Sequence, residues 1–153
     1  MKSRKYDIIV FGASGFTGKL VSEYLFKSKD SKNISWAIAG RDEDKLKKIA
    51  DNYNIDYILA DSFDLDSLNH ICSLSKLILS AVGPYMIYGE NLVYACIENS
   101  THYLDLTGEP QFVTNMYKKY RYKAIKNKSI VIHCCGFESI PADMGVNEIL
   151  KQF

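Results

Sequence analysis

The sequence lacks several features that would narrow its class at once. Its four cysteines show no C-x-x-C spacing, and no run approaches the roughly 18 apolar residues that a transmembrane helix needs. Glycines at Gly12–Gly18 interrupt the first apolar stretch too early for a signal peptide. Neither sign of charge is in excess, with 19 basic and 18 acidic residues, so no nucleic-acid partner is indicated. These absences predict an intracellular, cytoplasmic protein with no metal site and with reduced, buried thiols at Cys72, Cys96, Cys134 and Cys135.

The most informative segment present is a glycine-rich stretch directly after the apolar run Tyr6–Phe11. A buried strand, a glycine turn and a helix start are typical of a site for a dinucleotide pyrophosphate. One glycine permits a sharp turn, one permits approach of the backbone to phosphate, and one permits close packing of helix on strand. The spacing is Gly-x2-Gly-x2-Gly, less common than G-x-G-x-x-G, and a glycine triplet alone is weak evidence. The candidate binding residues are Gly12, Ala13, Ser14, Gly15, Phe16, Thr17 and Gly18.

Apolar and amphipathic segments alternate along all 153 residues. We expect strands at 6–11, 34–39, 56–59, 77–82, 102–106 and 129–134. Helices are expected at 16–28, 43–53, 64–72, 89–99, 110–126 and from Pro141, and Leu20, Val21, Tyr24 and Leu25 should form the packed face of the first. Several strands are apolar throughout, which indicates a parallel sheet covered on both faces. The predicted fold class is therefore α/β, a doubly wound parallel sheet of about six strands.

Glycine and proline concentrate in the loops that leave the carboxyl ends of the predicted strands. Eight of the nine glycines, all but Gly145, and all three prolines lie there. Turn chemistry alone would distribute these residues over both edges of the sheet. Ligands bind beyond the carboxyl ends of strands in open α/β sheets, so we interpret this edge as the functional one.

The end of the second predicted strand carries the residues that would select the cofactor. An acid there binds the ribose 2′-hydroxyl of NAD, whereas an arginine accommodates the 2′-phosphate of NADP. Arg41 favours NADP by charge and bidentate geometry, while Asp42 either argues for NAD or caps the helix that begins near Glu43. Asp61, after the third strand, is placed to touch the adenine, with an N-cap or turn role as the alternative.

The fourth strand end, Val82-Gly83-Pro84-Tyr85, crowds small residues and a proline where the nicotinamide half would lie. Tyr85 and Tyr88 are placed to wall this pocket. Hydride transfer also needs a proton donor near the acceptor. None of the histidines suits this role, because His70 lies on a helix, His102 begins a strand and His133 faces a core layer. Candidates on the functional edge are Tyr85, Tyr88, Asp105, Glu109 and Glu138, with Glu109 also placed to cap the Pro110 helix, and the sequence singles out none of them as catalytic.

These motifs together resemble the amino-terminal domain of the saccharopine dehydrogenase-like oxidoreductases, a family that includes trans-acting enoyl reductases. The resemblance is carried by Tyr6–Gly18, Trp36–Arg41, Ala81–Gly89, 95–98, Thr101–Glu109 and Cys135–Gly145. It implies an NAD(P)-binding Rossmann domain over residues 1–153 and a second domain that completes the substrate site. On this reading the chain stops at Phe153, where that second domain should begin, so the isolated chain should not be active.

The resemblance is compatible with an amino-acid imine, a lipid enoyl group or another molecule as substrate. Family members on lipid droplets point to lipids and to a droplet or organelle membrane, but no stretch here is amphipathic enough to show it. A homodimer is compatible with the sequence.

Two other functions are compatible with parts of the sequence. The domain could bind NADP without turnover, as a sensor or an interaction module. A short-chain dehydrogenase would need a Tyr-x3-Lys pair, which Tyr122 and Lys126 supply. Geometry disfavours the second function, since Tyr122 would lie about 18 Å along its helix from the functional edge at ~1.5 Å per residue.

Overall fold

The computed structural model describes residues 4–29 and 32–152, and its centre is a six-stranded parallel sheet. The strands are β1 (Tyr6–Phe11), β2 (Trp36–Gly40), β3 (Asp56–Leu59), β4 (Ser75–Ser80), β5 (His102–Asp105) and β6 (Val131–Ile132). They lie side by side in the order β3-β2-β1-β4-β5-β6, with every pairing parallel. The chain therefore starts at the middle of the sheet and builds outward in both directions. This confirms the predicted doubly wound α/β fold.

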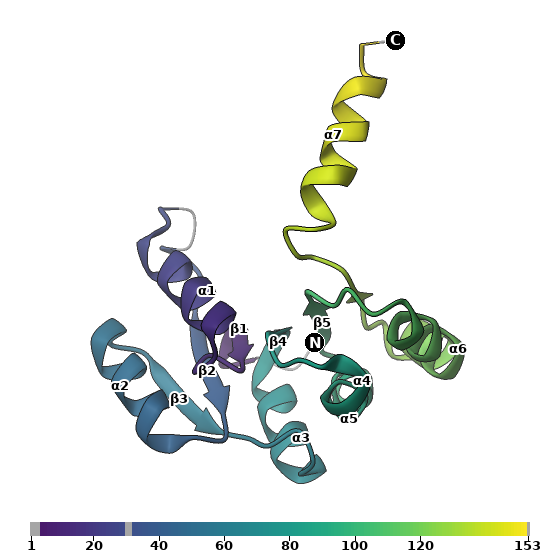
Figure 1. The fold of residues 1–153 in the computed structure, drawn as a ribbon. Coiled ribbons are helices and arrows are strands. Elements are labelled where there is room, and N and C mark those ends of the chain that lie inside the picture. The colour runs from purple at the N-terminus through teal and green to yellow at the C-terminus, as the bar shows by residue number, and fades with distance from the viewer. Residues whose placement is uncertain (1–3, 30–31, 153) are drawn as a thin grey trace.

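Helices cover both faces of the sheet (Figure 1). They are α1 (Phe16–Lys27), α2 (Glu43–Tyr53), α3 (Leu65–Leu74), α4 (Tyr85–Tyr88), α5 (Glu90–Glu98), α6 (Pro110–Asn127) and α7 (Ile140–Leu150). One core lies under α1 and α2, and a larger core lies under α3, α5 and α6. Successive strand side chains point to opposite faces, so in β1 Ile9 and Phe11 enter the larger core while Val10 enters the smaller one.

Local capping explains where several helices begin. The Asp42 carboxylate accepts a hydrogen bond from the Lys45 amide at 3.1 Å and so caps α2, as one of the two interpretations of Asp42 predicted. Asp64 caps α3 by accepting from the amides of Asp66 and Ser67. Pro110 occupies the first turn of α6, where no backbone N–H is needed.

The bounds of several strands differ from prediction. The fourth strand is at 75–80 rather than 77–82, and the sixth is limited to Val131–Ile132 instead of 129–134. The chain leaves the sheet early here because Cys134 takes a left-handed conformation, with φ at 62°. The second strand starts at Trp36 rather than at residue 34, and the Ser35 amide and hydroxyl both donate to the Asp7 carboxylate. The short helix α4 was not predicted.

The packed face of α1 is not the one predicted. Leu20 and Tyr24 are 51% and 68% exposed, whereas Gly18 and Ser22 are buried. Small residues at these two positions let the helix axis approach the sheet, and Ser22 Oγ donates to the Gly18 carbonyl at 2.8 Å. The expectation of a face formed by Leu20, Val21, Tyr24 and Leu25 was therefore wrong for Leu20 and Tyr24.

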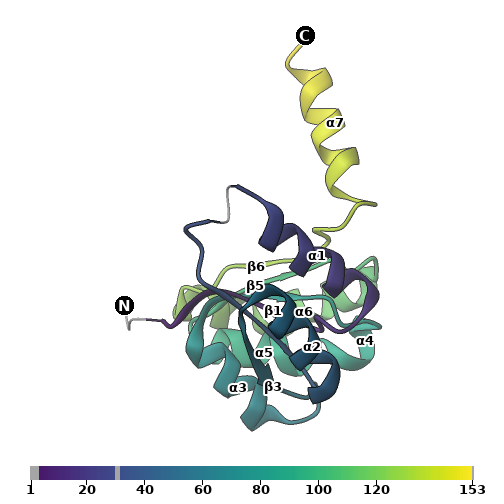
Figure 2. The ribbon, with the colours of Figure 1, turned by 90° about the vertical axis from the view of Figure 1, so that its left-hand side faces the viewer.

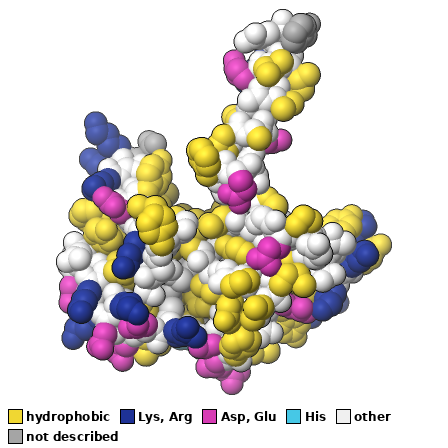
Figure 3. Space-filling model, in the orientation of Figure 1, with side chains coloured by type: hydrophobic (Ala, Val, Ile, Leu, Met, Phe, Trp, Pro, Cys, Tyr) yellow, Lys and Arg dark blue, Asp and Glu magenta, His cyan; other side chains and the backbone are white. Residues whose placement is uncertain are grey.

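Helix α7 extends away from the rest of the protein (Figure 2). None of its residues is buried, and hydrophobic side chains run along it in the space-filling view (Figure 3).

On the α1 side of the sheet, Leu79 and Leu104 are only half-buried, while Ile78 and Tyr103 on the opposite side are fully buried. Within residues 4–29 and 32–152, no helix is both long enough and apolar enough to cross a membrane.

A matched pair of leucine substitutions tests this assignment of core and surface. Leu92→Ala removes a fully buried side chain of α5 and should lower the unfolding free energy by about 3 kcal/mol, since burial is lost and a cavity is left. Leu20→Ala, on the exposed face of α1, should lower it by less than about 1 kcal/mol. Urea denaturation measures both. Equal losses would show that Leu20 is packed after all.

Candidate cofactor site

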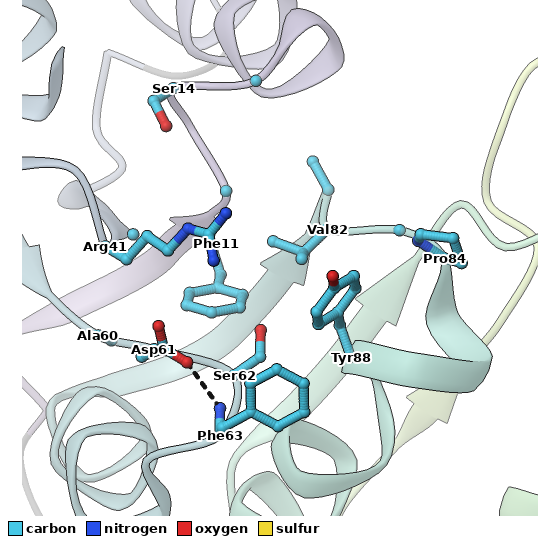
Figure 4. A pocket seen from close by; sticks show the side chains of 15 residues that line it. Phe11, Ser14, Arg41, Ala60, Asp61, Ser62, Phe63, Val82, Pro84 and Tyr88 are labelled. Carbon is cyan, nitrogen blue, oxygen red and sulfur yellow. Dashed lines mark hydrogen bonds between the residues drawn. The ribbon is translucent and has the colours of Figure 1, made fainter.

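A cavity of about 390 Å³ opens at the carboxyl ends of the central strands (Figure 4). It lies where β1 stands between β2 and β4, the point at which the strand order reverses direction. This is where doubly wound sheets bind dinucleotides. Its walls come from the loops after β1, β2, β3 and β4, together with Tyr88. The lining residues are Phe11, Gly12, Ser14, Gly15, Gly40, Arg41, Ala60, Asp61, Ser62, Phe63, Ala81, Val82, Gly83, Pro84 and Tyr88.

The first two glycines of the loop after β1 shape its approach to the cavity. Gly12 has φ of 85°, a left-handed conformation, and a Cβ there would lie 2.5 Å from Val82 Cγ2. Gly15 occupies the N-cap position of α1, and it has no side chain that could accept a hydrogen bond from the amides of the first turn. The amides of the first turn of α1 are therefore left for an anion, which the helix dipole also favours.

The third glycine sets how closely α1 lies on the loop. A Cβ on Gly18 would lie 2.2 Å from the Gly12 carbonyl oxygen and 2.7 Å from Ala13 Cα. No side chain fits there. Gly12 and Gly18 thus have the turn and close-packing roles expected from the spacing.

The structure brings most, but not all, of the predicted binding residues to the cavity. Gly12, Ser14, Gly15, Arg41, Asp61, Val82, Gly83 and Pro84 line it. The other five predicted residues do not. Ala13 is buried beneath the loop, Phe16 is 82% exposed, and Thr17 and Gly18 belong to the first turn of α1. The fifth is Tyr85.

Tyr85 lies in the core, and Tyr88 takes its expected place in the cavity wall. The Tyr85 hydroxyl donates to the Ser80 carbonyl at 3.0 Å and accepts from the Leu106 amide. Burial raises the pKa of Tyr85 to about 12, which keeps this hydroxyl protonated at neutral pH. Tyr88 lines the cavity and meets the edge of the Phe63 ring, with centroids 5.4 Å apart. Phe63 was not predicted as a site residue. Its position in the loop directly after β3, at the carboxyl edge of the sheet, was a signal that could have identified it.

The two side chains at the end of β2, Arg41 and Asp42, differ in whether they have a partner. Arg41 extends toward the cavity (Figure 4) and has no ion-pair partner among the described residues. Asp42 is occupied with Lys45, through the helix cap and an ion pair of 2.6 Å. Asp61 lines the cavity while its carboxylate accepts from the Phe63 amide at 2.8 Å, so the predicted turn role is confirmed.

The histidines have structural partners or lie outside the cavity, as predicted. His102 Nδ1 accepts from the Ile130 amide, and His70 is exposed on α3. His133 Nδ1 lies 2.6 Å from Asp105 Oδ2, and its ring packs edge-on against Phe112. Asp105 itself is fully buried, and Glu138 lies beside Gly136.

The expectation that Glu109 caps α6 was wrong. Its side chain makes no cap there, and its carboxylate instead accepts from the amides of Tyr85 and Met86.

The thiols differ in burial more than expected. Cys72 and Cys96 are buried with their Sγ atoms 3.5 Å apart, but Cys134 and Cys135 are only half-buried. Burial raises the pKa of both Cys134 and Cys135, which disfavours the nucleophilic thiolate. Neither is a candidate nucleophile.

The short-chain dehydrogenase alternative finds no support in the geometry. Tyr122 is 74% exposed on α6, where the Arg121 guanidinium lies 4.7 Å from its ring centroid. Neither Tyr122 nor Lys126 lines the cavity.

Comparison with known proteins decides the family. The family model described as the saccharopine dehydrogenase NADP binding domain matches residues 8–132. The chain belongs to the saccharopine dehydrogenase-like oxidoreductases. It is the NADP-binding domain of that family, and its cofactor is a dinucleotide.

Relatives extend the similarity over nearly the whole chain. The chain is 42% identical to the "Lipid droplet localized protein" of Caenorhabditis elegans, covering 97% of this chain and 37% of that protein. It is 39% identical to the "Saccharopine dehydrogenase-like oxidoreductase" of Mus musculus, covering 95% of this chain and 37% of that protein. The chain thus spans little more than a third of the length of these relatives.

A solved structure shows the same fold at low identity. Apo saccharopine dehydrogenase (L-Glu forming) from Saccharomyces cerevisiae superposes with a TM-score of 0.76 at 18% identity, covering 95% of this chain and 32% of that one.

A matched pair of glycine substitutions tests the close packing at the loop. Gly18→Ala places a methyl group against the Gly12 carbonyl, so α1 must shift, and stability should fall by about 2 kcal/mol together with NADPH affinity. Gly145→Ala on α7 meets nothing within 4 Å and should leave both unchanged or raise stability slightly. Chemical denaturation and NADPH titration measure the two effects. A Gly18→Ala protein as stable as Gly145→Ala would contradict the packing.

Proposed function

We propose that the domain prefers NADP over NAD and serves an oxidoreductase that transfers hydride between the nicotinamide and its substrate. The observation that carries this preference is the contrast at the end of β2. Arg41 lines the cavity without an ion-pair partner among the described residues, whereas Asp42 is held by the α2 cap and by Lys45. A guanidinium pairs well with a 2′-phosphate, and an acid already hydrogen-bonded to its own helix is not free for a ribose hydroxyl.

Each part of the cavity then has a defined role toward the cofactor. The amides of the first turn of α1 bind the pyrophosphate, and Arg41 binds the 2′-phosphate of the adenosine half. Val82, Gly83 and Pro84 form a flat wall of small residues for the nicotinamide half. The nicotinamide supplies the hydride chemistry when it is bound. Ala13 and Tyr85 are buried behind the loops that make these contacts.

A second domain should complete the substrate site. The cavity wall holds no proton donor whose placement identifies it as catalytic, and the relatives are much longer than this chain. We infer that residues 1–153 form the cofactor-binding part and that the substrate is an amino-acid imine or a lipid-type molecule. The name of the Caenorhabditis elegans relative favours the lipid, and with it an intracellular location at a lipid droplet.

Substitution of Arg41 tests the cofactor preference. Arg41→Ala should weaken NADPH binding by about 10- to 100-fold, because one charge-assisted phosphate contact is lost, and should spare NADH. Titration of both dinucleotides, followed by nicotinamide fluorescence, gives the two affinities.

Arg121→Ala is the matched control for this test. Arg121 lies on α6 against Tyr117 and Tyr122, outside the cavity, so its removal should change neither affinity. Equal losses of NADPH and NADH in Arg41→Ala would remove the basis for preferring NADP.

A further inference from the structure

Helix α4 begins without a cap of its own. It has only four residues, Tyr85–Tyr88, and its N-cap is Pro84, whose side chain accepts no hydrogen bond. The amides at the start of a helix have no intrahelical acceptor and need one from elsewhere. These amides matter for the cofactor site, because Pro84 precedes them and Tyr88 ends the same helix, and both line the cavity.

The acceptor comes from the neighbouring strand-to-helix loop. Glu109 Oε1 accepts from the Tyr85 amide at 2.7 Å, and Glu109 Oε2 accepts from the Met86 amide at 2.9 Å. Both carboxylate oxygens are thus used on two consecutive amides, each in a charge-assisted hydrogen bond. The Glu109 side chain makes no cap on its own helix, α6, so both oxygens are available to α4.

The Glu109 backbone is held in turn by a buried carboxylate. Its amide donates to Thr107 Oγ1 at 3.1 Å, and the Thr107 amide donates to Asp105 Oδ1 at 3.1 Å. Asp105 and Thr107 are both buried.

Asp105 also connects this chain of hydrogen bonds to the end of β6. Its carboxylate accepts from the Cys134 amide at 3.2 Å and lies 2.6 Å from His133 Nδ1, and its carbonyl accepts from the Cys135 amide. The carboxyl ends of β4, β5 and β6 are therefore joined by one continuous network, and Glu109 is its contact with the cavity wall.

This network lies on one side of the cavity only. Arg41 and Asp61 stand at the ends of β2 and β3, whereas Pro84 and Tyr88 follow β4, on the other side of β1 (Figure 4). In doubly wound sheets the two halves bind the two mononucleotides. With the 2′-phosphate at Arg41, the wall that Glu109 holds faces the nicotinamide half.

We propose that Glu109 is a positioning residue for the nicotinamide half of the cofactor. It acts through α4 rather than by contact with the ligand, holding Pro84 and Tyr88 in place by its two hydrogen bonds. This inference depends on the proposed binding of NADP, and it adds that the two halves of the dinucleotide are supported by separate parts of the protein.

The test compares the whole cofactor with a fragment that lacks nicotinamide. Calorimetry gives the affinities of the full chain for NADPH and for 2′-phospho-ADP-ribose. In Glu109→Ala we expect NADPH to bind about tenfold more weakly, because the two hydrogen bonds that are lost hold the wall and not the ligand itself, and the fragment to bind within about twofold of the unchanged protein. Glu109→Gln keeps the shape and one acceptor oxygen, so its loss of NADPH affinity should be intermediate.

Glu98→Ala is the matched control. Glu98 pairs with Lys123 at the other end of α5 and α6 and does not line the cavity, so both affinities should stay unchanged. If Glu109→Ala does not fold, Glu109→Gln decides by the same two affinities.

Two results would overturn the proposal: an equal loss for both ligands, which means general destabilisation, or no loss for either. If the unchanged protein binds neither ligand, the proposed function fails and this inference fails with it.

Discussion

The close contact between α1 and the glycine loop is the constraint on which the cofactor site depends. With no side chain at Gly18, the first turn of α1 lies directly on the Gly12 carbonyl, and a methyl group would be only 2.2 Å from that oxygen. Gly12 in turn touches Val82 at the end of β4, so the loop spans the two central strands. These contacts fix the positions of the helix amides, the loop and the wall of small residues after β4 relative to one another. The cavity forms between them.

The two sides of this cavity differ in how they are supported. On the β2 side a single cation, Arg41, faces the cavity from an exposed loop and needs no further support to meet a phosphate. On the β4 side the wall is made of residues without charge, and its position depends on carboxylates behind it, Glu109 and the fully buried Asp105. A charged side chain thus faces the cavity directly on one side, whereas on the other side carboxylates act indirectly, through backbone amides.

Much of this arrangement could be predicted from sequence, because its signals are local. Glycine spacing, the alternation of strands and helices, and a cation directly after β2 each depend on neighbouring residues. The predictions that failed concern positions whose structure is determined by contacts with other segments of the chain. Glu109 and Tyr85 are 24 residues apart, and nothing near either shows that one caps the other's helix. Leu20 and Tyr24 share a helical face with Val21, but the neighbouring small stripe at Gly18 and Ser22 packs closer to the sheet. Which tyrosine, Tyr85 or Tyr88, enters the cavity likewise depends on a distant contact, since the Tyr85 hydroxyl accepts from the Leu106 amide 21 residues away.

The strand order has a further consequence for how the protein assembles as it is synthesised. The first strand made, β1, is central, and its second neighbour, β4, begins only at Ser75. Strands β1, β2 and β3 can therefore pair with one another and pack against α1 and α2 before the later strands are synthesised. One edge of β1 stays unpaired until β4 has been made. The cavity lies on this seam, so a ligand seated there contacts both halves and stabilises only the joined state. Binding of the dinucleotide then favours completion of the sheet itself.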